Sequence, residues 1–189
     1  MADKGIIFSA AMVRALLDGR KTQTRRLVKK PAALDALAVF KPAFLQLPGN
    51  ADLLPYAPGD RLYVREAHAI DGARSWYRLG HEEALARGPR VDVRWRPSIH
   101  MPRWASRLWL EVAEVRVQRI ADISEADALA EGIERVEYPE KGDWGWPQRR
   151  FAELWNSLHT TKGERWEDNP WIVAVSFNVH RGNIDEVAG

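Results

Sequence analysis

The 189-residue sequence contains no cysteine, which excludes disulfide bonds, thiol nucleophiles and cysteine-based zinc sites. It also lacks any apolar run near the roughly 18 residues typical of a membrane-spanning helix. The first residues show no basic segment followed by an apolar core, so we expect no secretory signal. These absences predict a protein without membrane segments, and the cytoplasm is its simplest location.

Several binding motifs are missing as well. There is no glycine-rich phosphate loop and no regular alternation of strands and helices, which argues against a nucleotide-binding α/β fold. The five histidines include no close pair resembling a metal site. We therefore expect no metal and no other cofactor.

Charge is low overall but unevenly distributed. The formal net charge is only +2, yet six cations and no acid occur between residues 20 and 30: Arg20, Lys21, Arg25, Arg26, Lys29 and Lys30. Such a segment can neutralise phosphates, and it is equally typical of a solvated loop. Nine tryptophans are many for this length and suit either core packing or base stacking.

The hydrophobic pattern predicts a mixture of strands and helices. Helices are expected over residues 10–18, 124–131 and 147–158, with Ser9 and Ser124 as N-caps. Strands are expected over 6–8, 22–28, 61–66, 91–95, 106–120 and 171–179. This order indicates an α+β fold with a mixed or antiparallel sheet.

The longest predicted strand carries a change of phase. Leu108, Leu110 and Val112 share one parity, whereas Val115 and Val117 share the other. A period-two strand needs an extra residue to keep both sets on one face, so a bulge is expected near residues 113–114. Such a bulge suits a small, strongly curved barrel.

We predict a single domain over residues 1–180. Two stretches with weaker signals, 31–55 and 68–92, are interpreted as insertions. The first contains a candidate short helix near 34–39 and the second one near 81–87. Residues 181–189 are expected to form a frayed tail.

One segment resembles a known family signature. Gly19-Arg20-Lys21-Thr22-Gln23-Thr24-Arg25-Arg26 is similar to the G-x-K-x-x-T-x-R signature of the ASCH family, in the PUA-like superfamily. The Pro58-Gly59-Asp60 turn, the helix ending at Glu131-Gly132 and the strand from Trp171 fit the same pattern. The segment from Trp95 to Trp104 also resembles long ASCH proteins of phages and prophages.

The resemblance implies a PUA-like fold, a small curved barrel with flanking short helices. Some bacterial ASCH proteins are metal-independent amidohydrolases that remove the acyl group from N4-acetylcytidine. Their catalytic lysine, threonine and glutamate match Lys21, Thr24 and Glu131 here. The implied substrate is an N4-acylated cytidine or a similar modified nucleoside, free or within RNA.

This chemistry is consistent with the residue types. A threonine hydroxyl becomes a nucleophile when a base takes its proton, and lysine can be that base if its pKa is lowered. Arg25 and Arg26 supply cations that favour such a shift. A carboxylate at Glu131 can position the lysine or return a proton to the leaving amine. Structural roles are alternatives to these catalytic ones. The helix dipole favours a lysine such as Lys21 after a helix C-terminus, and Thr24 suits a strand as a β-branched residue.

Further residues are candidates for binding the substrate or nucleic acid. They are Arg20, Thr22, Arg25, Arg26, Arg65, Glu66, Trp95, His100 and Trp104. The tryptophans suit base stacking or core packing, and a lone histidine is more often structural than catalytic. Arg65 and Glu66 either line the pocket or pair with each other.

Two alternatives to an amidohydrolase remain. The first is a non-catalytic RNA-binding module in which Lys21, Arg25 and Arg26 bind phosphates. The second, less favoured, is a ribonuclease that uses the same basic pocket. The sequence specifies no oligomeric state.

Overall fold

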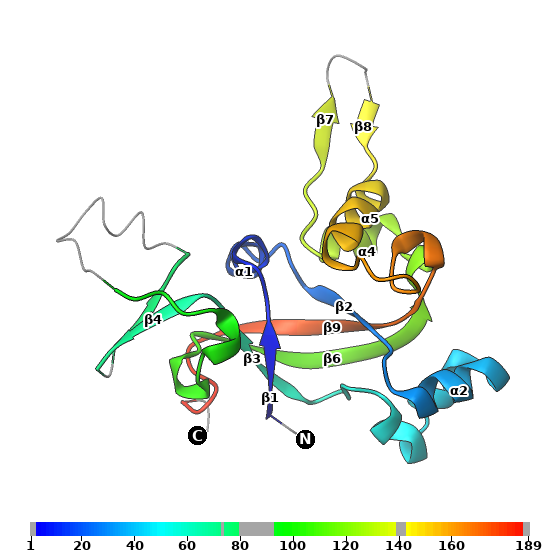
Figure 1. The fold of residues 1–189 in the computed structure, drawn as a ribbon, viewed down its shortest axis with the longest axis horizontal. Helices are drawn as coiled ribbons and strands as arrows, with labels where there is room; N and C mark the ends of the chain where they lie inside the picture. The colour runs from blue at the N-terminus through cyan, green and yellow to red at the C-terminus, as the bar shows by residue number, and fades with distance from the viewer. Residues whose placement is uncertain (1–2, 73, 80–92, 139–142, 187–189) are drawn as a thin grey trace. The chain divides into compact units, whose positions relative to one another are not determined.

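The computed structural model describes residues 3–72, 74–79, 93–138 and 143–186 (Figure 1). Within these ranges the chain forms an α+β fold with one mixed five-stranded sheet and two separate two-stranded sheets. The strand order in the large sheet is β1-β3-β6-β9-β2. The predicted α+β class and mixed sheet are therefore confirmed.

The chain divides into two compact units. The first comprises the described residues of Met1–Gly19, Gly59–Glu111 and Asn178–Gly189, and the second those of Arg20–Pro58 and Val112–Phe177. The long strands β6 (Leu108–Arg119) and β9 (Trp171–Arg181) contribute residues to both.

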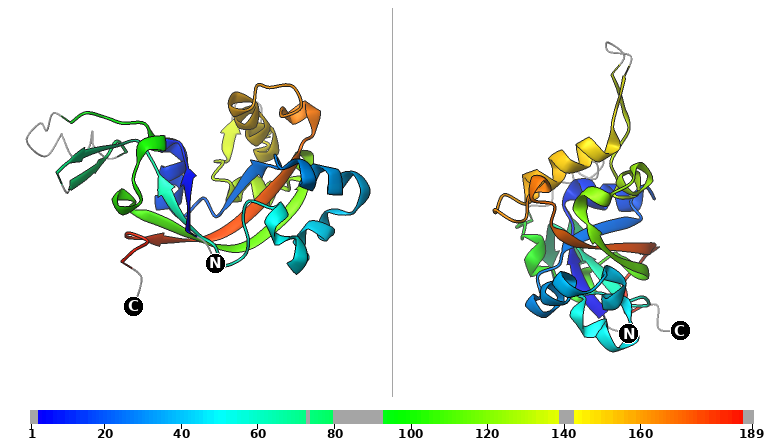
Figure 2. Two further views of the ribbon diagram at one scale, coloured as in Figure 1. Left: turned by 60° about the horizontal axis from the view of Figure 1, so that its bottom comes forward. Right: turned by 90° about the vertical axis from the view of Figure 1, so that its right-hand side faces the viewer.

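The first unit contains a parallel strand pair, a helix and a hairpin. Strand β1 (Asp3–Ile7) runs parallel to β3 (Arg61–Arg65), which pairs antiparallel with the start of β6. Helix α1 (Ala10–Leu17) begins at Ser9, whose hydroxyl accepts a hydrogen bond from the Met12 amide. Strands β4 (His68–Asp71) and β5 (Arg74–Tyr77) form the hairpin, visible in Figure 2.

The second unit is built on β2 (Gln23–Leu27), which pairs antiparallel with β9. Helices α4 (Glu125–Ala130) and α5 (Pro147–Leu158) contact each other, and α4 also contacts β2. A short hairpin of β7 (Val136–Tyr138) and β8 (Asp143–Gly145) lies between these helices in sequence.

Helix α2 (Pro31–Val39) and two 3₁₀ turns, η1 (Pro42–Gln46) and η2 (Pro48–Leu53), complete the second unit. The helix begins at Pro31, earlier than the short helix predicted, because proline is well suited to the first helical position.

Apolar side chains of the second unit form a core between the sheet and the two helices α4 and α5. Its fully buried members are Ile120, Ile123, Ala128, Phe151, Trp155, Ile172 and Ala174. Along α5, Phe151 and Trp155 are buried in this core, whereas Leu158 at its end is 68% exposed. This core packs α4 and α5 against β9, the strand that pairs with β2.

One local prediction differs from the structure, and one element of the structure was not predicted. The strand predicted over 91–95 is absent from its described residues 93–95, and only Arg96 forms an isolated bridge, with His68. The hairpin β4–β5 was not predicted, although Asp71-Gly72 is a typical turn pair and Gly72 has a φ of +57°. The helix predicted near 81–87 lies outside the described residues.

The tail is ordered further than predicted. Strand β9 continues to Arg181, and Ile184 is fully buried. The Asn183 side-chain amide donates hydrogen bonds to the carbonyls of Arg103, Trp104 and Ser106. These contacts offset the loss of chain entropy, so residues 182–186 are not frayed.

Gly132, which follows α4, has a φ of +90°, a conformation that costs an L-residue about 1–2 kcal/mol. We expect Gly132→Ala to lower the free energy of unfolding by about that amount. Chemical denaturation measures the change. Gly49→Ala is the matched control, because Gly49 has no positive φ and open space beside it. Equal stabilities of the two variants would contradict this account.

Candidate functional site

Lys21 and Glu131 meet inside the second unit. Only 1% of Lys21 and 5% of Glu131 is exposed to solvent. The Lys21 Nζ donates to the Glu131 carboxylate Oε2 at 2.6 Å and to the Glu131 backbone carbonyl at 2.8 Å. The two residues also form an isolated antiparallel backbone bridge. The ion pair is thus held from both backbone and side chain.

The local sequence explains why Glu131 stands there. Helix α4 ends at Glu131, because Gly132 turns the chain with a positive φ. An acid at a helix C-terminus faces the negative end of the helix dipole, which is unfavourable. Cations from the segment before and within β2 compensate this charge.

Arg25 provides the second cation of the cluster. Its side chain is fully buried, and its Nη1 donates to Glu131 Oε1 at 3.1 Å. Its Nη2 forms an ion pair with the Asp127 carboxylate at 3.2 Å. The guanidinium also lies 5.7 Å from the centre of the Phe151 ring. Arg25 therefore ties β2 to both α4 and α5.

Asp127 and Arg116 extend the cluster. Arg116 Nη2 donates to Asp127 Oδ1 at 3.0 Å. Burial alone would raise the pKa of Asp127, but the hydrogen bond from Arg116 and the charge of Arg25 hold it below its usual value. We call Lys21, Arg25, Arg116, Asp127 and Glu131 the ion cluster.

Burial lowers the pKa of Lys21 from its ordinary value of 10.5. The charges of Arg26 and Arg25 lower it as well, whereas Glu131 opposes the shift. A lysine in this environment releases its proton more readily than a solvated one. It thus has one property that a general base needs.

Thr24 lies on the opposite face of β2 from Arg25. Successive residues of a strand alternate in direction, and Arg25 stands opposite Ala174, a member of the core beneath α4 and α5. Thr24 stands opposite Val175 and shares its face with Arg26. Thr24 is 4% exposed.

The remaining residues of the signature are at the surface. Arg20 Nη1 donates to the Gly132 carbonyl and forms an ion pair with Glu134 at 3.2 Å. Thr22 is exposed. Its backbone amide donates a hydrogen bond to the Ala130 carbonyl, and its carbonyl accepts one from the Phe177 amide.

Five predicted binding residues belong to the first unit. They are Arg65, Glu66, Trp95, His100 and Trp104. Glu66 is buried and accepts two hydrogen bonds from Arg107, at 2.8 and 2.9 Å. Of the two alternatives for Arg65 and Glu66, pairing with each other is not observed: Glu66 pairs with Arg107, and Arg65 donates to the Ile99 carbonyl.

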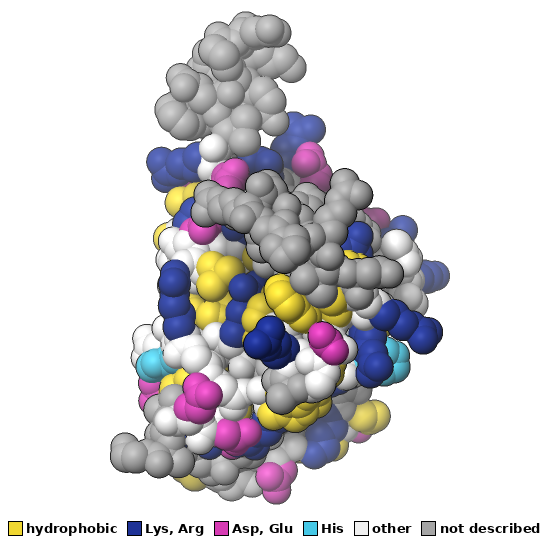
Figure 3. Space-filling view, turned by 90° about the vertical axis from the view of Figure 1, so that its left-hand side faces the viewer, with side chains coloured by type: hydrophobic (Ala, Val, Ile, Leu, Met, Phe, Trp, Pro, Cys, Tyr) yellow, Lys and Arg dark blue, Asp and Glu magenta, His cyan; other side chains and the backbone are white. Residues whose placement is uncertain are grey.

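The other three residues, Trp95, His100 and Trp104, differ in their exposure to solvent. His100 ends a short 3₁₀ turn and is exposed, Trp104 is 49% exposed, and Trp95 is half-buried. In the space-filling view of Figure 3, basic side chains stand among acidic ones and do not form one continuous patch on that face.

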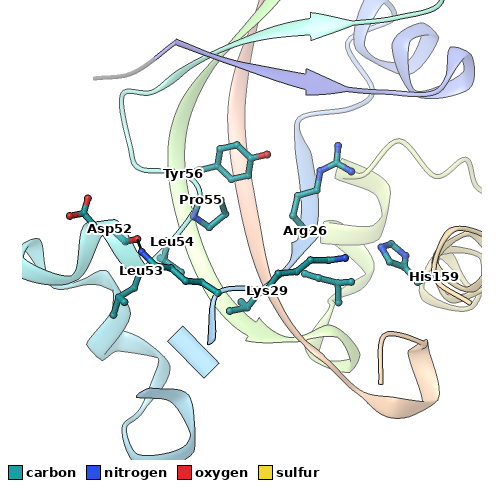
Figure 4. Close-up of a pocket in the computed structure, with 11 residues that line it drawn as sticks. Arg26, Lys29, Asp52, Leu53, Leu54, Pro55, Tyr56 and His159 are labelled. Atoms are coloured by element: carbon teal, nitrogen blue, oxygen red, sulfur yellow. Dashed lines mark hydrogen bonds between the residues drawn. The ribbon is translucent and has the colours of Figure 1, made fainter. Parts of the chain in front are cut away.

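Several residues of the ion cluster and of a neighbouring cavity were not predicted from the sequence. Asp127 stands four residues before Glu131, a spacing that places both on one side of a helix and could have revealed it. A cavity of about 550 Å³ at the end of β2 includes Tyr56 and His159 (Figure 4). These two are distant in sequence, and no local pattern links them.

No family model matches this sequence, and no curated protein matches it. Solved structures that are similar over most of the chain include the following two. A protein of Enterococcus faecalis V583 described by the family model DUF984 has a TM-score of 0.46 and 14% identity, over 97% of this chain and 83% of its own. An ASCH domain of Lactobacillus crispatus JV V101 has a TM-score of 0.46 and 12% identity, over 94% and 79%.

Within the described residues, no group of three or more histidine, aspartate or glutamate side chains has an arrangement that would hold a metal ion. The same part of the chain contains no helix with the length and apolarity of a membrane span.

Removing Glu131 is expected to be costly, because it leaves two buried cations without their shared carboxylate. We expect Glu131→Ala to lower the free energy of unfolding by about 3–5 kcal/mol. The exposed Glu134 is the matched control, and Glu134→Ala should cost no more than about 1 kcal/mol. Denaturant titration measures both, and similar losses in the two variants would refute the compensating role of Glu131.

The lowered pKa of Lys21 predicts a pH effect on stability. Between the folded pKa and 10.5, the unfolded chain holds the Lys21 proton and the folded protein does not, so stability rises with pH over that window. Lys21→Met should abolish this rise. The exposed Lys41 serves as control, and Lys41→Met should leave it unchanged. Unfolding free energies measured between pH 7 and 10.5 test this prediction. Parallel curves for wild type and Lys21→Met would contradict the lowered pKa of Lys21.

Proposed function

We propose that this protein is a metal-independent amidohydrolase that acts on an N4-acylated cytidine or a similar modified nucleoside. The observation that carries the proposal is the buried pair of Lys21 and Glu131, 2.6 Å apart, with a lowered pKa at Lys21. Perturbed ionisable groups of this kind concentrate at functional sites. The resemblance of residues 19–26 to the ASCH signature supports the same residues.

The proposed reaction requires the Thr24 hydroxyl to come within reach of the Lys21 amine. Neutral Lys21 then takes the hydroxyl proton as the Thr24 oxygen attacks the acyl carbon. The bond from this carbon to the exocyclic nitrogen then breaks, and the nitrogen leaves with a proton returned by the lysine. Water hydrolyses the resulting acyl-threonine ester, which releases the carboxylic acid and restores the hydroxyl. The products are cytidine and the free acid.

Glu131 fits the role of a proton shuttle. Its carboxylate Oε2 is the oxygen that contacts the Lys21 amine, and its Oε1 contacts Arg25. The contact with Arg25 fixes the orientation of this carboxylate, so that its Oε2 faces the Lys21 amine. Burial excludes water and strengthens each of these interactions.

The non-catalytic RNA-binding alternative depended on Lys21 and Arg25 as phosphate contacts. Both side chains are turned inward and paired with carboxylates, so neither offers its charge to a phosphate at the surface. Among the three cations of that hypothesis, only Arg26 is not buried. This placement favours catalysis over the RNA-binding alternative.

Hydrolysis of N4-acetylcytidine, followed by chromatography of released cytidine, tests the proposal. We expect Thr24→Val to lower the rate by at least about 100-fold, because valine keeps the shape and lacks the hydroxyl. Thr24→Ser is the matched control and should retain most of the activity. Lys21→Met should lower the rate about 10²–10⁴-fold.

The pH profile separates catalysis from folding. The rate of wild type should rise with pH as Lys21 loses its proton, with a midpoint below 10.5. No cytidine release by wild type, or full activity of Thr24→Val, would exclude the mechanism.

A further inference from the structure

The cavity at the end of β2 is built from two segments far apart in sequence and from a single residue after helix α5. Its lining residues are Arg26–Lys30, Asp52–Tyr56 and His159. In Figure 4 the segment Asp52–Tyr56 lies on one side of the space, and Arg26 and His159 lie on the other. A volume of about 550 Å³ is within the usual range for small-molecule sites.

Three cations and one acid line this cavity: Arg26, Lys29, Lys30 and Asp52. Lys30 Nζ donates to the Asp52 backbone carbonyl, which ties the two segments together. Lys29 pairs with Glu164 at 3.1 Å, but 71% of its side chain is exposed. An exposed ion pair of this kind contributes little free energy, so an anionic ligand can displace Glu164 from Lys29. The charge balance of the lining favours an anion.

The cavity also has an apolar and aromatic part. Leu27, Leu53, Leu54, Pro55 and Tyr56 are among its lining residues. Two contacts fix the orientation of the His159 ring. Its centroid lies 3.9 Å from that of the stacked Trp155 ring, and its Nδ1 forms a 3.1 Å hydrogen bond with the Trp155 carbonyl. With Nδ1 donating to that carbonyl, Nε2 is the nitrogen left for a ligand. Such a surface suits a flat ring as well as a charged group.

Strand β2 connects this cavity to the proposed nucleophile. Arg26 follows Thr24 by two residues on the same face, so the two stand about 7 Å apart along the strand. A nucleoside phosphate extends further than this distance. A nucleotide bound at the Arg26 side chain therefore has the length to extend toward Thr24, which is buried and does not itself line the cavity.

We propose that this cavity binds the phosphate and the adjoining sugar or base of a nucleoside phosphate, so that the substrate is a nucleotide or a strand of RNA and not a free nucleoside. Arg26 and Lys29 contact the phosphate, and Tyr56 packs against a ring. The choice of a cytidine base rests on the proposed amidohydrolase function, whereas the phosphate site rests on the cavity alone.

Calorimetric titration of the full chain with cytidine and with cytidine 5′-monophosphate tests the phosphate site. Neither ligand carries an acyl group, so binding is measured without turnover. We expect the monophosphate to bind at least roughly tenfold more tightly, because a charged hydrogen bond to Arg26 or Lys29 contributes about that factor. Equal affinities would overturn the proposal.

Lys29→Gln should remove most of the advantage of the monophosphate and leave cytidine binding unchanged. Since Lys29 is largely exposed, the variant is expected to fold normally. Lys41→Gln makes the same change at an exposed position outside the cavity and should keep the full advantage. An unchanged advantage in Lys29→Gln, or an equal loss in Lys41→Gln, would also overturn the proposal.

A short single-stranded oligocytidylate distinguishes the two sources of the phosphate. Tighter binding than the monophosphate, with a steep decrease in salt, identifies an RNA strand, and equal binding identifies a free nucleotide. The hydrolysis assay is read separately. Preference for the monophosphate without any hydrolysis would refute the proposed reaction alone, and hydrolysis without this preference would refute the phosphate site alone.

Discussion

The second unit depends on one electrostatic constraint, the burial of Glu131 between Lys21 and Arg25. Removing three charges from water costs several kcal/mol for each, and their mutual attraction offsets this cost only when the geometry is close. The 2.6 Å and 3.1 Å contacts require that α4 end at Glu131 and that β2 begin just after Lys21. The core packs Ala128 of α4 and Phe151 of α5 against β9, which pairs with β2.

Much of the fold could be predicted because local physics determined it. Helix α5 and strand β9 have strong apolar periodicity, and the predicted bounds for α5 agree with the structure. The turn at Gly132 and the cap at Ser124 follow from residue type. The strand predicted over 91–95 was wrong over its described residues, because alternation there had no partner strand to satisfy it. Ile184 was missed since its burial depends on contacts distant in sequence.

The site was predicted only in part, for a similar reason. Residue spacing and family resemblance brought Lys21 and Glu131 forward, and their contact is present. The roles of Arg25 and Arg26 could not be separated from a run of like charges. They differ because a strand directs neighbours to opposite faces, so Arg25 enters the core and Arg26 reaches the cavity. The pairing of Glu66 with Arg107 was not foreseen, since Arg107 is 41 residues away in the chain.

Because neighbouring side chains of β2 point to opposite faces, substitutions in this short segment have two kinds of consequence. Substitutions at Lys21 or Arg25 change the ion cluster and with it the stability of the unit. Substitutions at Arg26 or in the segment Asp52–Tyr56 alter the lining of the cavity and leave the buried ion pairs in place, although the charge of Arg26 also contributes to the lowered pKa of Lys21. Related chains can therefore diversify in substrate by altering one face of the strand, while the other face keeps the fold intact. Specificity in such a protein can evolve with little cost in stability.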